Sequence, residues 1–149
     1  LTKKPEYAQC VRSQRCIIIA DGYYEWRQGS RGKQPYYIYN TENSILPFAG
    51  LWEQWENNKK QYRLTCTIIT TESIGELKII HNRMPIILRA DKVDTWIDCS
   101  HSQDEALEIL KPYYKGLNYY PVSKSVNTVM NNSHKCIEPI MMEENEIIP

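Results

Sequence analysis

One histidine and one arginine stand two positions apart between two apolar runs, in a stretch that extends from residue 79 to residue 88. Pro85 favours an extended backbone for the residue before it. If the stretch is extended, His81 and Arg83 point to the same face. An imidazole that titrates near neutral pH, beside a permanently charged guanidinium, suits work on a phosphate-bearing substrate. The alternative is a hydrogen-bonded core histidine and a surface arginine, and these two residues alone do not decide between the two interpretations.

Glu25 is the second residue that could do chemistry. It lies between Tyr24 and Trp26 in a strand-like segment, so we expect its carboxyl group to be partly desolvated. Desolvation raises the pKa of a carboxyl group and makes it usable as a general acid or base. Trp26 could stack on a nucleic-acid base. The alternatives are a salt-bridged or exposed strand glutamate and a tryptophan that packs in the core. Glu25 and His81 would form an acid–base pair only if the fold brings them together.

Other kinds of catalytic or binding motif are missing from the sequence. There is no Gly-x-Ser-x-Gly elbow for a serine nucleophile and no glycine-rich loop for phosphates. The cysteines are odd in number, scattered, and without a Cys-x-x-Cys pair, so we expect reduced thiols in a cytosolic setting, with no disulfide framework and no metal site. They are Cys10, Cys16, Cys66, Cys99 and Cys136.

Length and composition are those of an ordinary globular domain. The 149 residues are 42% hydrophobic and 24% charged, which is enough for one domain with a proper core. The formal net charge is zero, so any affinity for nucleic acid must come from a local patch. We see no signal peptide and no apolar run long enough to cross a membrane. Because the chain starts at Leu1 with a polar stretch, we expect it to be N-terminally truncated.

Strand patterns dominate the chain and must position these side chains. We expect strands at residues 15–20, 23–27, 35–39, 46–53, 62–70, 86–88 and 119–122. A polar loop is expected at residues 54–60, and a solvated acidic tail at 141–149. Short helices are expected at residues 5–12, 71–77, 91–97 (capped by Asp91) and 103–110 (opened by a capping box at Ser102). The pattern predicts an α+β fold: one β-rich domain over residues 1–149, with antiparallel or mixed sheet, a barrel-like closure, and short peripheral helices.

Five segments together resemble the SOS response-associated peptidase (SRAP) family. The first runs from Arg15-Cys16 through Ala20-Asp21-Gly22-Tyr23-Tyr24-Glu25-Trp26. A second, at residues 80–88, is similar to the family's His-Asp-Arg-Met-Pro signature. The other three lie at residues 33–38, 48–53 and 122–132. All five keep the order of the family and span Arg15 to about Pro139.

The resemblance implies a single-domain, β-rich protein that senses abasic sites in single-stranded DNA. In such proteins the cysteine after the initiator methionine reacts with the ring-opened sugar aldehyde and gives a thiazolidine cross-link. By resemblance, Glu25 is the acid/base glutamate, and His81 helps to open the sugar ring and to reverse the link. Arg83 holds phosphate, Thr70 lies near the reacting sugar, and Trp26 forms part of the DNA-facing wall. No metal and no other cofactor is implied.

Two departures from the family pattern matter. The amino-terminal cysteine and an Asn-Ala-Arg-Ser-Glu segment are absent from this sequence, so we expect the chain alone to form no cross-link by the family mechanism. Asn82 replaces the usual aspartate, which leaves His81 and Arg83 in register.

Two further functions remain open at this point. One is a cysteine-type peptidase or hydrolase that removes its own initiator methionine, and the other is a non-catalytic module that binds single-stranded DNA. For the abasic-site function, with its lyase-like chemistry, we expect a place in the DNA damage and SOS responses. We expect a cytoplasmic monomer that joins the nucleoid when it is bound to DNA and that has no membrane contact.

Overall fold

The computed structural model describes residues 5–42, 45–113 and 115–142, and these form two compact units. Unit 1 holds the described residues of Leu1–Ala20, Leu46–Glu72 and Arg83–Tyr113. Unit 2 holds those of Asp21–Ile45, Ser73–Asn82 and Tyr114–Pro149. Each unit therefore draws on three separate segments of the chain and is described by itself. The prediction of one domain over residues 1–149 stays a prediction.

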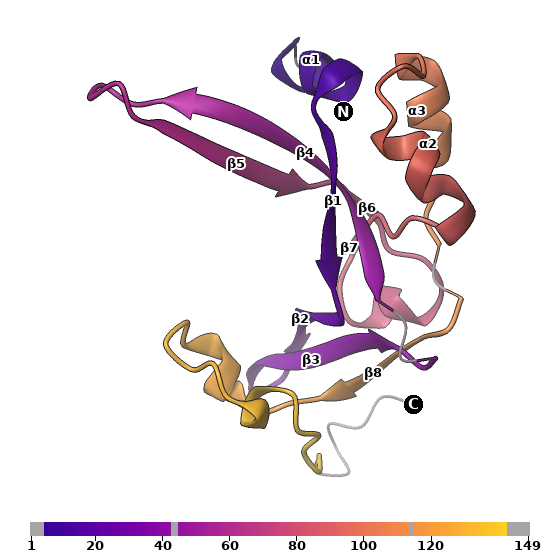
Figure 1. Cartoon of the computed structure of the whole chain (residues 1–149). Coiled ribbons are helices and arrows are strands. Elements are labelled where there is room, and N and C mark those ends of the chain that lie inside the picture. Colours follow the sequence, from indigo (N-terminus) through magenta and orange to yellow (C-terminus); the bar gives the residue numbers. More distant parts are fainter. Residues whose placement is uncertain (1–4, 43–44, 114, 143–149) are drawn as a thin grey trace. The chain divides into compact units, whose positions relative to one another are not determined.

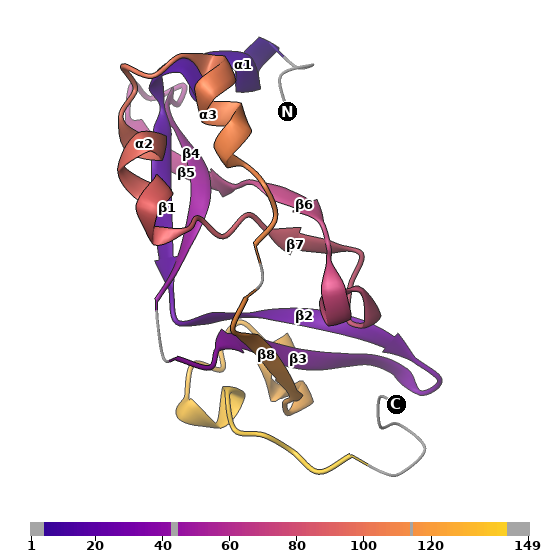
Figure 2. The ribbon, with the colours of Figure 1, turned by 90° about the vertical axis from the view of Figure 1, so that its right-hand side faces the viewer.

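Unit 1 contains two antiparallel sheets (Figure 1). The first has the order β1-β4-β5, with β1 at Arg15–Ala20, β4 at Leu46–Glu56 and β5 at Tyr62–Ile68. The second pairs β6, Thr70–Glu72, with β7, Arg83–Pro85, and Figure 2 shows these two short strands side by side. Gly50 of β4 is needed for close packing, because a Cβ atom there would lie 2.0 Å from Cδ1 of Ile18.

Three short α-helices complete unit 1: α1 at Pro5–Ser13, α2 at Val93–Ile97 and α3 at Gln103–Ile109. The expected capping box is present, since the hydroxyl of Ser102 accepts a hydrogen bond from the backbone N–H of Glu105. The expected cap at Asp91 is wrong: the 3₁₀ turn η2, Ala90–Lys92, precedes α2 and has no side-chain cap. Buried side chains from the helices, from β4 and from the residues just outside β6 and β7 form one core, which includes Val11, Leu51, Ile86, Trp96 and Ala106.

Unit 2 is built on one antiparallel sheet of order β2-β3-β8. Its strands are β2, Gly22–Gly29, β3, Gly32–Asn40, and β8, Leu117–Pro121. The hairpin turn between β2 and β3 is tighter than we expected, because Gly29 already pairs with Gly32 (Figure 2). Three 3₁₀ helices accompany the sheet: η1 at Gly75–Ile79, η3 at Lys124–Asn127 and η4 at His134–Cys136.

Two expected strands differ from the structure for a tertiary reason. The strand predicted at residues 62–70 is broken at Ile69, whose N–H donates to the carbonyl of Ala49 while its own carbonyl accepts from the N–H of Ile86. The chain thus changes partner at this residue, and β6 pairs with β7 rather than with β4. Residues 86–88 are buried as expected, but they form only an isolated bridge, between Phe48 and Ile87, and no regular strand.

Two element boundaries also need correction. β4 extends to Glu56, so the loop predicted at residues 54–60 begins later. Thr71 and Glu72 belong to β6, and the expected helical turn begins only at Gly75. Residues 143–149 of the predicted tail lie outside the described residues.

The fold class is α+β with antiparallel sheets, as the sequence predicted, but the described residues form three of the four expected helices as α-helices, and the fourth is the 3₁₀ helix η1. The barrel-like closure is wrong for the sheets that the structure describes, since each is an open sheet with two edge strands. No described helix has both the length and the apolar character to span a membrane.

Candidate functional site

Glu25 and His81 come together within unit 2. Oε2 of Glu25 lies 3.6 Å from Nδ1 of His81, so the fold does bring these two groups together. Glu25 is held in the middle of β2, opposite Tyr36 of β3. His81 follows η1, and its backbone N–H donates to the carbonyl of Leu77, a buried residue that anchors this turn.

The surroundings of Glu25 change its acidity. Burial raises the pKa of this carboxyl group above its ordinary value, and the nearby His81 and the backbone N–H of Trp26 offset only part of the rise. Burial, reinforced by the charge of Glu25, also raises the pKa of Tyr23. A carboxyl group that keeps its proton to a higher pH is a better proton donor near neutrality. His81 is the more accessible partner, with 41% of its side chain exposed against 23% for Glu25.

Asn127, a residue to which the sequence assigned no role, holds the side chain of Trp26. The indole N–H of Trp26 donates to Oδ1 of Asn127 over 2.7 Å, and its ring centroid lies 6.4 Å from that of Tyr24. The side chain is half-buried, so part of the indole packs against the protein and part remains accessible. Asn127 lies in the last of the five family-like segments, which was the only signal in the sequence that could have identified it.

Arg83 and Thr70 meet in unit 1. Nη2 of Arg83 donates to the carbonyl of Thr70 over 2.7 Å and to its hydroxyl over 2.8 Å. Pairing of β6 with β7 sets this contact, since Thr70 lies opposite Pro85 and Glu72 opposite Arg83. Both residues line a hollow of about 360 Å³. Its other lining residues are Tyr7, Thr67, Ile68, Ile69, Thr71, Ile86 and Leu110.

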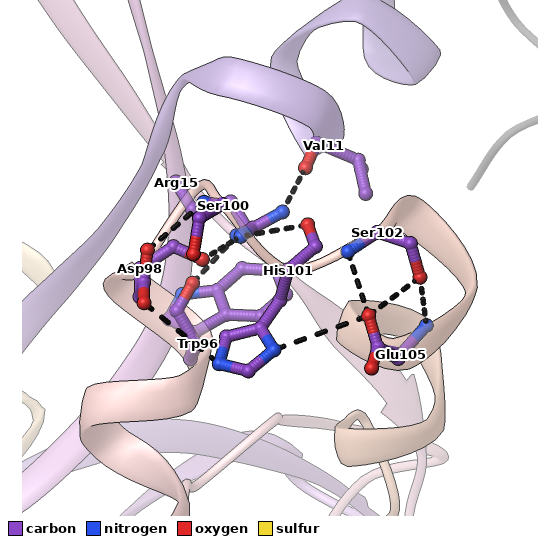
Figure 3. A network of polar contacts seen from close by, with 8 residues as sticks. All are labelled: Val11, Arg15, Trp96, Asp98, Ser100, His101, Ser102 and Glu105. Carbon is purple, nitrogen blue, oxygen red and sulfur yellow. Dashed lines mark hydrogen bonds and ion pairs between the residues drawn. The ribbon is translucent and has the colours of Figure 1, made fainter.

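Arg15, in the first family-like segment, has a structural role. Its buried guanidinium donates to the backbone carbonyls of Val11, Trp96 and Asp98, and more weakly to that of His101. The guanidinium carbon also lies 5.7 Å from the ring centroid of Trp96. Figure 3 shows that these acceptors come from α1, α2 and the turn that leads to α3. Arg15 therefore joins the helices of unit 1 to β1.

The five cysteines differ in their exposure to solvent. All are free thiols: Cys66 and Cys99 are exposed, Cys16 is half-buried, and Cys10 and Cys136 are buried. Burial raises the pKa of Cys10 and of Cys16, which lowers their thiolate fraction near neutral pH. Among the described residues there is no group of three or more His, Cys, Asp or Glu side chains that could hold a metal ion.

Comparisons with known proteins agree with the family-like segments. The sequence model of the family described as "SOS response associated peptidase (SRAP)" matches residues 1–129. The abasic site processing protein HMCES of Gallus gallus is 34% identical over 161 residues, which cover 94% of this chain and 48% of that protein. The abasic site processing protein YoaM of Bacillus subtilis is 38% identical over 141 residues, which cover 93% of this chain and 62% of that protein.

A solved structure shows the same fold. The crystal structure of a protein from Bacteroides thetaiotaomicron has a TM-score of 0.84 and 28% identity, over 93% of this chain and 62% of the other. The chain thus spans about half to three-fifths of the length of these relatives. The match over residues 1–129 and the shared identity show that the chain belongs to the SRAP family.

Proposed function

We propose that the chain is part of an abasic-site processing protein, one that binds single-stranded DNA and acts on the sugar at a site that has lost its base. The observation that carries this proposal is the contact between Glu25 and His81, at 3.6 Å, in a chain whose relatives are named for abasic-site processing. The final product is a thiazolidine cross-link to an amino-terminal cysteine, which the present sequence does not include. The protein acts as a monomer in the cytoplasm and on the nucleoid.

The pair provides the proton transfers that open the abasic sugar. The closed sugar is a hemiacetal, so its C1–O4 bond must break before an aldehyde exists. Glu25, whose pKa is raised by burial, gives its proton to O4 as that bond breaks. His81 accepts the proton of the C1 hydroxyl, and the electron pair of that O–H bond forms the carbonyl. The aldehyde then condenses with the amine of the cysteine, which releases one water, and the thiol adds to the resulting imine to close the ring.

The remaining site residues bind the strand. Arg83 presents a planar, permanently charged fork that matches a phosphate, with Thr70 as its hydrogen-bonded partner. Trp26 offers the accessible part of its indole to a neighbouring base.

A cross-linking experiment tests the proposal. The chain, and a version that carries any residues its gene encodes ahead of Leu1, are mixed with an abasic single-stranded oligonucleotide and resolved on a denaturing gel. We expect a covalent band only with a version that starts with cysteine after methionine removal. In that version, Glu25→Gln and His81→Ala should each slow the single-turnover rate of cross-link formation. The larger of the two losses should be at least about a hundred-fold. Rates equal to that of the unmodified protein, with folded variants, would show that the pair has no chemical role.

The same experiment separates the other functions. Loss of the initiator methionine or cleavage of a peptide, without any DNA adduct, would replace the proposal with a cysteine-type hydrolase. Reversible DNA binding alone, from a version that does start with cysteine, would indicate a non-catalytic binding module.

A further inference from the structure

A basic hollow lies at the tip of the β2–β3 hairpin, in unit 2. It encloses about 310 Å³, and its lining includes three cationic side chains, those of Arg27, Arg31 and Lys124, but no carboxylate. The other lining residues are Gln28, Gly29, Ser30, Gly32, Gln34, Tyr36 and Met142. In a chain with equal numbers of acidic and basic residues, three positive charges around one hollow are a local departure from neutrality.

The hollow opens on the same face of the sheet as Glu25. Side chains alternate along a strand, so Glu25 and Arg27 share a face of β2. Their antiparallel partners on β3, Tyr36 and Gln34, share that face, and both line the hollow. Residues two apart lie about 6.6 Å from each other along a strand. The acid–base pair and the hollow are therefore neighbours on one hairpin.

Hydrogen bonds hold Lys124 against this hairpin. Nε2 of Gln34 donates to the carbonyl of Val122 over 2.8 Å, and the N–H of Val122 donates to the carbonyl of Pro35 over 3.0 Å. Lys124 follows two residues later, at the start of η3. The other end of η3 is tied to β2 by the bond between Trp26 and Asn127. The backbone that carries this cation is thus fixed in advance, which lowers the entropic cost of binding an anion.

We propose that the hollow is a phosphate-binding subsite, which takes a backbone phosphate of the DNA strand next to the nucleotide held at Glu25 and His81. This inference rests on the proposed function and extends it along the strand. The two arginines can form bidentate bonds to phosphate oxygens, while Lys124 adds a point charge. The tetrahedral phosphate is small enough for the hollow, and its charge is opposite in sign to that of the lining side chains.

The salt dependence of DNA binding tests the subsite. A labelled single-stranded oligonucleotide without an abasic site is titrated with the unmodified chain and with the double variant Arg31→Ala/Lys124→Ala. We expect weaker binding and a plot of log K against log salt that is shallower by about 0.7 for each phosphate that the variant no longer neutralises. Lys33→Ala is the matched control, because this exposed lysine follows Gly32 in the hairpin but does not line the hollow. Its slope should remain close to that of the unmodified chain.

Two readouts keep the subsite and the proposed function distinguishable. Equal slopes for the unmodified chain and a folded double variant would overturn the subsite, even if abasic DNA is still processed. A shallower slope without any abasic-site chemistry, in any version of the protein, would support the subsite and overturn the proposed function. If the double variant does not fold, Lys124→Gln alone decides, because its side chain is exposed and its loss should still reduce the slope.

Discussion

The residue whose chemistry the fold changes most clearly is Glu25. Its pKa lies above the ordinary value of 4.5 because the fold buries it. A raised folded-state pKa gives stability that is fully present below the unfolded pKa and is lost as the pH rises through the folded pKa. Glu25→Gln removes this titration but keeps the shape of the side chain. We therefore expect that, as the pH rises above about 4.5, the free energy of unfolding of the variant increases relative to that of the unmodified chain.

Urea unfolding at a series of pH values measures this difference. If the two free energies differ by a constant amount at every pH, Glu25 does not titrate abnormally and its value as a proton donor is lost.

Arg83 should matter more for DNA binding than for stability. Its side chain is exposed and bonds to Thr70, so Arg83→Ala should change the free energy of unfolding by no more than about 1 kcal/mol. Affinity for single-stranded DNA should fall, and the salt slope should become shallower by about 0.7 if Arg83 neutralises one phosphate. Binding titrations at several salt concentrations, with a thermal melt, separate the two effects. An unchanged slope with a lower melting temperature would make Arg83 a structural residue.

At the scale of single elements, local signals predicted some bounds correctly and missed those that tertiary pairing sets. β1 was predicted at its observed bounds, because an apolar run is closed by Asp21-Gly22, a turn pair. The capping box at Ser102 was equally local. The break at Ile69 was missed, because that residue bonds to Ala49 and Ile86, which lie far away in the sequence. Strand propensity continues through Ile69, so only the tertiary pairing ends the strand there.

Gly22 fixes the packing of β2 and gives an element-level prediction. A Cβ atom at this position would lie 2.3 Å from the ring of Tyr37, a buried residue on β3. Gly22→Ala should therefore destabilise the protein by about 1–3 kcal/mol through overpacking. Gly29→Ala, at the other end of the same strand, meets only the carbonyl oxygen of Gly32 at 3.3 Å and should cost less. Chemical denaturation of both variants measures the contrast, and equal costs would contradict the packing argument.

Arg15 gives a second prediction about elements. Its fork satisfies backbone carbonyls of α1, α2 and the turn after α2, and lysine cannot reproduce that geometry. Arg15→Lys should cost about 2–4 kcal/mol, because buried carbonyls then lose their donors. Arg12→Lys is the control, since Arg12 is exposed and, within the described part of the chain, its side chain bonds to that of Gln103. Comparable losses for the two variants, measured by urea unfolding, would show that the buried network contributes little.

For the whole molecule, the sequence supplied the site residues but not their grouping. Glu25 and His81 were paired by resemblance, and their contact in unit 2 depends on η1 returning to β2 from a distant part of the chain. Arg83, two residues after His81, belongs to unit 1, which no local pattern indicated. The basic hollow was also missed, because the net charge of zero conceals it and Lys124 joins the hairpin only through tertiary hydrogen bonds.

The alternation of the two units along the chain leads to a prediction about cooperativity. Each unit is built from three segments separated by segments of the other, so unfolding either one would leave long open loops within its partner. Closing longer loops costs more entropy, which should couple the two transitions. Cys10 is buried in unit 1 and Cys136 in unit 2, so each thiol reports on the opening of one unit. We expect both to become reactive at the same denaturant concentration, as one cooperative domain requires.

Pulse labelling with a thiol reagent across a urea series, followed by peptide mass analysis, measures both midpoints. The exposed Cys66 and Cys99 are internal controls that should react even without urea. If Cys136 reacts at a clearly lower urea concentration than Cys10, unit 2 opens by itself. The acid–base pair would then be lost before unit 1, which holds Arg83 and Thr70, unfolds, and the prediction of one domain over residues 1–149 would be wrong.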